Sequence, residues 1–158
     1  MTTGKLLGLA LLGSASLISA ALAQPVADGG RKFTTPMSGA EECDSSGTCG
    51  VGDTDGSATG SITVNVGQDR VCWEFTNVAN IAVPNRGHIH KAAAGSNGPI
   101  VVDFFNVAAG TQGPLTGCTT APLGKALLTD ILQNPSGYYL NLHNADFPAG
   151  AVRGQLEK

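Results

Sequence analysis

The sequence has little charge, few aromatic residues and no surplus of positive charge. Charged residues make up 13% of its 158 residues, about half the roughly 25% that is usual in soluble proteins. Nine Lys and Arg stand against twelve Asp and Glu, for a net charge of −3, which excludes a generic basic surface for nucleic acids. Because aromatic residues contribute only 5%, we expect an aliphatic core.

Glycine, by contrast, is abundant. The chain contains 22 glycines, about twice the usual share of roughly 7%. Hydrophobic residues make up 42%, which is enough to build a core. This combination favours a single, turn-rich β domain.

The longest uncharged stretch lies at the N-terminus, from Leu6 to Ala27. It follows Lys5, and Ala21-Leu22-Ala23 stands before Gln24, which is the layout of a cleavable secretory signal over residues 1–23. The stretch is also long enough to span a bilayer, but its small residues and the Ala-x-Ala site favour cleavage. We therefore expect a secreted or periplasmic protein with no membrane attachment after cleavage.

The chain has four cysteines: Cys43, Cys49, Cys72 and Cys118. In an oxidising compartment an even set favours disulfides, for which three pairings exist. We favour Cys43 with Cys49, because a flexible turn separates them, which leaves Cys72 with Cys118. A four-cysteine metal site is the alternative, although this spacing fits zinc sites poorly.

Alternation of apolar and polar residues predicts β-strands. In residues 61–66, for example, Ile62, Val64 and Val66 share one face. Further strands are expected at 33–37, 70–75, 86–90, 99–104, 138–143 and 151–156. Residues 125–133 show helical spacing instead and end before Asn134-Pro135. After a flexible segment at 24–31, residues 32–158 are expected to form one all-β domain, an antiparallel β-sandwich or flattened Greek-key barrel with one short helix.

The three histidines carry the clearest chemical signal. His88 and His90 alternate around Ile89, so both imidazoles lie on one strand face, with Cα atoms about 6.6 Å apart. His143 ends a second strand, on the face opposite Leu142. Three imidazoles suit copper or zinc, and an open fourth position would take water or a substrate. The alternative is that these histidines are hydrogen-bonded structural groups.

Several motifs, in order, resemble the CHRD (chordin-type) domain family, which also includes exported bacterial proteins. They are Ser38-Gly39-Ala40-Glu41-Glu42, Gly87-His88-Ile89-His90, the segment from Gly95 to Val102, the segment from Tyr138 to His143, and Arg153-Gly154-Gln155-Leu156. The resemblance covers nearly all of the chain from residue 32 to 156. The sequence departs from the family pattern at Cys43, Asn144 and Ala151. The family implies protein interaction but no defined enzyme activity.

The histidine strands are also similar to the copper-ligand strands of copper/zinc superoxide dismutases, which are β-sandwiches as well. Here there is no bridging histidine and no set of zinc-loop ligands, so a zinc-bridged dismutase is excluded. By this resemblance Arg153 is expected to attract an anion. Asn141, on the face of His143, is expected to orient an imidazole.

These patterns leave three functions open. The first is an exported binding protein whose His88, His90 and His143 bind one copper ion, with zinc as the alternative metal. The second is an extracellular interaction module that binds a protein or polysaccharide and no metal. The third is a copper-only enzyme similar to superoxide dismutase, and for this we assign no catalytic residue.

Overall fold

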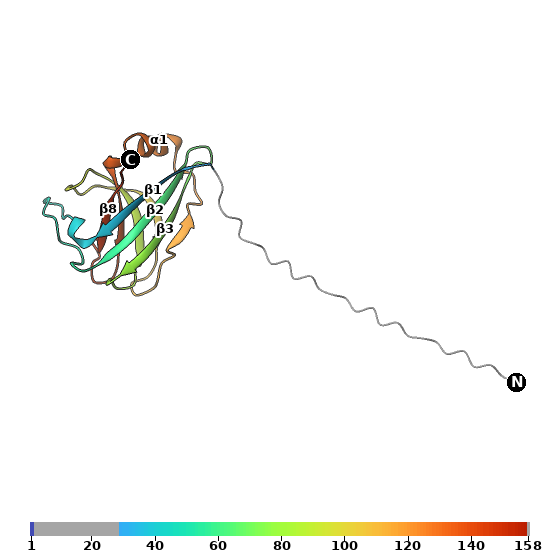
Figure 1. The fold of residues 1–158 in the computed structure, drawn as a ribbon, viewed down its shortest axis with the longest axis horizontal. Helices are drawn as coiled ribbons and strands as arrows, with labels where there is room; N and C mark the ends of the chain where they lie inside the picture. Colours follow the sequence, from blue (N-terminus) through green and yellow to red (C-terminus); the bar gives the residue numbers. More distant parts are fainter. Residues whose placement is uncertain (2–28, 158) are drawn as a thin grey trace.

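The computed structural model of the chain describes Met1 and residues 29–157 (Figure 1). The expected signal peptide therefore lies, apart from Met1, outside the described residues, as do residues 24–28 of the segment that follows it. In the described part of the chain, no helix is both long enough and apolar enough to cross a membrane.

The described residues form eight strands, one α-helix and two short 3₁₀ helices. The strands are β1 (Arg31–Ser38), β2 (Ser57–Asn65), β3 (Arg70–Ala79), β4 (Arg86–Lys91), β5 (Ile100–Asn106), β6 (Thr116–Cys118), β7 (Tyr138–His143) and β8 (Val152–Gln155). The helices are η1 (Gly39–Glu41), α1 (Lys125–Gln133) and η2 (Pro135–Gly137).

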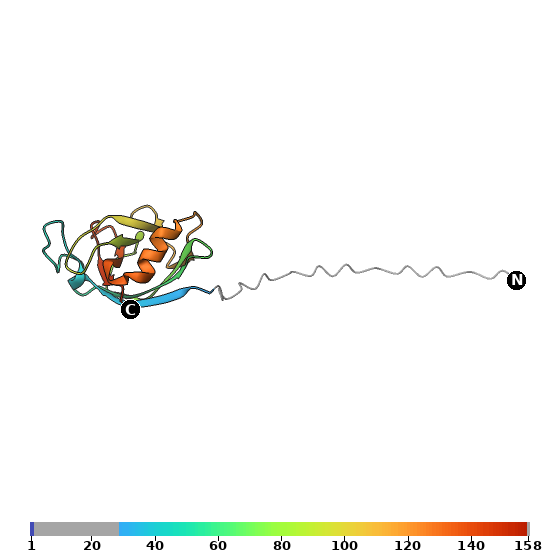
Figure 2. The same cartoon turned by 90° about the horizontal axis from the view of Figure 1, so that it is seen from above.

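All strand pairs are antiparallel and form one sheet in the order β5-β4-β7-β8-β1-β2-β3-β6. The sheet curls into a nearly closed barrel with β5 and β6 at its two edges (Figure 2). Inside it, the Trp73 ring on β3 stacks on the Phe104 ring on β5, with centroids 4.9 Å apart. The expected all-β antiparallel fold is thus confirmed, in its barrel form.

The strand β6 was not expected from the sequence. It has only three residues, including Gly117, so it offers no apolar alternation to read. It pairs with β3, where Cys118 lies opposite Cys72, and a disulfide joins the two. A second disulfide joins Cys43 to Cys49. Both bonds follow the pairing that the sequence favoured, and they fit an extracytoplasmic protein.

The helix α1 covers one end of the barrel (Figure 2). It spans the expected residues, and its buried Leu128 and Ile131 join the hydrophobic core. Asp130 accepts hydrogen bonds from Lys91 of β4 and from the Tyr138 hydroxyl of β7. The helix is therefore attached by polar contacts to the two strands that carry the histidines.

The strands β4, β7 and β8 are buried on both faces. Their inward face contributes Ile89, Leu140, Leu142 and Val152 to the core, all at 0% exposure. Most of their alternate residues, on the outer face of the barrel, are polar and yet buried as well, with Arg86 at the start of β4 exposed. Loops cover this outer face, and the histidines lie beneath them.

Candidate metal centre

The three histidines form one buried cluster on the outer face of β4 and β7. In the register of these strands, Arg86 lies opposite His143 and His88 opposite Asn141. His143 is therefore the diagonal neighbour of His88 on the same face. One nitrogen from each of His88, His90 and His143 lies within 4.8 Å of the other two, so the cluster could hold a metal ion. The three residues are 3%, 7% and 6% exposed.

Two loops fix the orientation of His90 and His143. The Nδ1 atom of His90 is 2.9 Å from the carbonyl oxygen of Gly98, and Nδ1 of His143 is 3.1 Å from that of Pro148. A carbonyl oxygen only accepts, so each Nδ1 carries the proton and donates it. Glycine is required at position 98, because a Cβ there would collide with the backbone oxygen of Lys91.

An acidic side chain fixes the third ring. The Nε2 atom of His88 is 3.0 Å from Oδ1 of Asp103 on β5, so Nε2–H donates to the carboxylate. The other nitrogen, Nδ1, is 3.1 Å from Nε2 of His143. All three rings thus place their N–H on an outside acceptor, which leaves lone pairs on His88 Nδ1, His90 Nε2 and His143 Nε2. His90 Nε2 is buried and has no hydrogen-bond partner among the described residues.

The three imidazoles are held in their neutral form. Burial lowers the pKa of His88 to about 4, and the neighbouring charges of His90 and Arg86 act in the same direction. Burial also lowers the pKa of His143 to about 4, and the charge of His88 is the second cause that lowers it. At neutral pH the 3.1 Å contact therefore joins two lone pairs, which repel each other unless a cation lies between them. Neutral imidazole is the form that binds metals.

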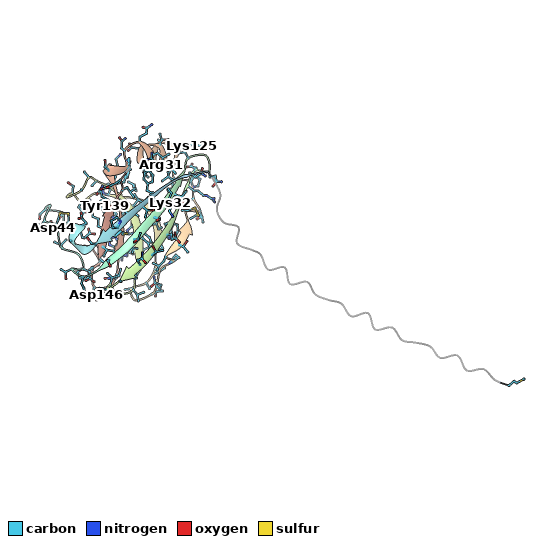
Figure 3. The ribbon with its side chains drawn as sticks, in the orientation of Figure 1. Arg31, Lys32, Asp44, Lys125, Tyr139 and Asp146 are labelled. Carbon is cyan, nitrogen blue, oxygen red and sulfur yellow. A yellow bond between two sulfur atoms is a disulfide. The ribbon has the colours of Figure 1, made fainter. Side chains whose placement is uncertain are left out.

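Arg153, the group expected above to attract an anion, lies on β8 beneath the loop between β4 and β5. It is 1% exposed, and its guanidinium donates to the carbonyl oxygens of Ser96 and Ala93, at 2.8 and 3.0 Å. It lies 3.4 Å from the centre of the Tyr139 ring, which in turn stacks on the His90 ring (Figure 3 labels Tyr139). Arg153 thus holds the loop between β4 and β5 over the cluster through these hydrogen bonds.

Asn141 lies at the cluster but makes no hydrogen bond to an imidazole. Its Nδ2 donates to Oε2 of Glu42 at 2.7 Å, and the expected orienting role toward an imidazole stays a prediction. Burial raises the pKa of Glu42, against the opposing effects of the Asn141 bond, the Arg153 charge and the Cys43 N–H. At Gly150 a Cβ would collide with this carboxyl group, so glycine leaves room for it.

Sequence reasoning missed the groups that surround the histidines. Asp103 carried a usable signal, because it alternates with the buried Val102 and Phe104 on β5 and so faces outward. Gly98 and Pro148 act through backbone oxygens, which no sequence motif reveals. Glu42 follows the 3₁₀ helix η1 and does not lie on a strand. Strand alternation therefore could not predict the direction of its side chain.

Comparisons with known proteins complete the description of the site. The CHRD domain model matches residues 33–156, a range that contains all three histidines and the residues that anchor them. Neither the comparison with curated proteins nor the comparison with solved structures found a match. The resemblance to superoxide dismutases therefore stays a prediction. With the family model covering most of its length, the chain belongs to the CHRD domain family.

Proposed function

We propose that this protein is an exported metal-binding protein in which His88, His90 and His143 bind a single copper ion. One observation supports this above all: each ring donates its N–H to an outside oxygen, one nitrogen from each ring lies within 4.8 Å of the other two, and His88 Nδ1 and His143 Nε2, both left without a proton, are 3.1 Å apart. Metal-binding histidines commonly donate their second nitrogen to a carboxylate or carbonyl in this way. A cation among these nitrogens removes the repulsion between the lone pairs.

The donor set favours copper among the available ions. Imidazole nitrogen binds copper, zinc, iron and nickel, and copper(II) binds most tightly of the divalent series. Within the cluster there is no thiolate, and the nearest carboxylate, Asp103, is occupied by the hydrogen bond from His88. Copper(I) also accepts three imidazoles without further ligands. Zinc is the alternative metal, because three histidines and an open position also suit it.

The location follows from the cysteines and the N-terminus. Both disulfides need an oxidising compartment, and residues 1–23 have the layout of a signal peptide. In such a compartment the protein would bind copper ions outside the cytoplasm. We therefore place its function in the periplasm or outside the cell.

The test is a measurement of bound metal on protein purified without a histidine tag. We would load the protein with copper(II), remove loosely bound ions with a weak chelator, and measure metal per chain by atomic emission. We expect about one copper ion per chain. The variants His90→Gln and His143→Gln should each abolish tight binding. Asp55→Asn removes an exposed acid elsewhere and serves as the control for adventitious binding.

Three results would change the proposal. Tighter binding of zinc than of copper in a competition titration would make zinc, rather than copper, the proposed metal. Unchanged stoichiometry in the folded histidine variants would overturn the ligand assignment. Absence of bound metal in the folded wild-type protein would favour the interaction module that binds a protein or polysaccharide. If copper binds, an assay for superoxide dismutation becomes the next measurement.

A further inference from the structure

A second arginine, Arg86, lies beside the histidine cluster in an exposed position. It precedes His88 by two residues on β4, so the two side chains share the outer face, with Cα atoms about 6.6 Å apart. In the register with β7 it lies directly opposite His143. Within the described part of the chain, its guanidinium makes no hydrogen bond or ion pair.

The charge of Arg86 acts on the same part of the cluster. It lowers the pKa of both His88 and His143, after burial and the neighbouring histidines. Arg153, by contrast, is enclosed by the loop between β4 and β5 and donates to carbonyl oxygens. Asp103, whose side chain is 68% exposed, accepts from His88. Arg86 is thus an unpaired cation at the cluster, while Arg153 is already committed to structural contacts.

The ligand set also determines what else the metal would bind. Three neutral imidazoles leave the charge of the ion uncompensated in a buried position, which is unfavourable. Three protein ligands also leave a coordination position open for a further ligand. A small anion at that position would both complete the coordination and reduce the net charge.

We propose that the metal at this site binds a small anion and that the exposed Arg86, rather than Arg153, attracts this anion to it. The inference rests on the proposed metal site and specifies the class of its exogenous ligand. It assigns Arg86 as a positioning residue that acts through its charge.

The experiment uses azide as the probe and the copper(II)-loaded protein. Azide binding to copper(II) produces a charge-transfer absorption, which gives the azide dissociation constant by titration. We would compare wild type with Arg86→Gln and with Arg31→Gln, which removes the same charge elsewhere. Arg31 is the first residue of β1 (Figure 3 labels Arg31). The pairing of β1 with β8 is at Ser38, at the other end of the strand, so Arg31 is a charge far from the histidine strands. Metal content is measured on every sample.

We expect Arg86→Gln to weaken azide binding about fivefold, as one charge at this separation would. Arg31→Gln should leave the azide constant unchanged, and added salt should weaken binding more in the wild type than in Arg86→Gln. Equal azide constants for wild type and Arg86→Gln would overturn the role of Arg86. Copper-loaded wild type that binds no azide would overturn the anion position itself. A wild type without bound copper would instead refute the metal site, and the inference with it.

Discussion

The two faces of β4, β7 and β8 are buried to nearly the same extent but are built from opposite chemistry. The inward face carries Ile89, Leu140 and Leu142 at 0% exposure. The outward face of the same strands carries His88, His90 and His143, at 3–7%. The inward residues pack against apolar neighbours, whereas the outward ones are enclosed by loops and fixed by hydrogen bonds.

This difference separates residues that stabilise the core from residues of the candidate metal centre within single strands. A buried apolar side chain stabilises the fold in proportion to the surface that it removes from water. A buried imidazole with an unpaired nitrogen costs free energy and is retained for another reason. Burial alone therefore does not identify a core residue, and the partner of each polar atom has to be examined.

The largest expected effect comes from a change to the inward face. Leu140→Ala should lower the free energy of unfolding by about 3 kcal/mol, because it leaves a cavity in the aliphatic core. Denaturant titration of the metal-free protein measures this loss. The folded fraction should still bind metal with unchanged stoichiometry.

The matched change on the outward face is His90→Gln. It should lower the free energy of unfolding of the metal-free protein by only about 1 kcal/mol, the contribution of one hydrogen bond. It should nevertheless abolish tight metal binding. If both variants destabilised the protein equally, the two faces would not differ in the way described.

Arg153→Gln addresses the loop that covers the outward face. The variant loses the charged donor to Ser96 and Ala93, and we expect a loss of about 2 kcal/mol. Hydrogen exchange should accelerate in residues 92–98, while the core strands keep their protection. Uniform acceleration across the barrel would contradict a role confined to this loop. Arg31→Gln, at an exposed position, is the control.

Asp103→Ala tests the anchor of His88. Removing the acceptor for Nε2–H should weaken metal binding about tenfold, at the low end of such effects because the carboxylate is largely exposed. Asp103→Asn keeps an acceptor oxygen and should recover most of the affinity. Competition titration with a chelator of known affinity measures both. Equal affinities for Asp103→Ala and wild type would show that the ring needs no anchor.

The smallest effect concerns the contact between α1 and the histidine strands. Hydrogen bonds from Lys91, then from Tyr138 and Asn134, hold the pKa of Asp130 well below its ordinary value of 3.8. Because the folded-state pKa is lowered, the stabilisation is present above about pH 4 and is lost as the pH falls below it. The difference in stability between wild type and Asp130→Asn should therefore be measurable at neutral pH and shrink in acid. A difference that stays constant with pH would argue against this carboxylate.

The sequence predicted the strands that alternate and the face of each histidine. Residues 138–143 and 125–133 were predicted with the bounds that the structure shows, because their apolar spacing is regular. The strand β6 was missed because three residues show no period. The partners Gly98, Pro148 and Asp103 could not be predicted, since they depend on how loops and strands distant from each histidine pack. The contacts of Arg153 with Ser96 and Ala93 depend on the packing of a distant loop in the same way.

The distance along the chain between the histidines bears on when the site can exist. His88 and His143 are 55 residues apart, and the second follows α1 and η2. During synthesis, the first two rings emerge long before the third, and all three are brought together only when β7 pairs with β4. Because β7 lies between β4 and β8, the three rings come together in the same step that joins the β4–β5 hairpin to the rest of the barrel. Any ion bound by all three rings would therefore be taken up only after the barrel has closed, from the compartment in which folding ends.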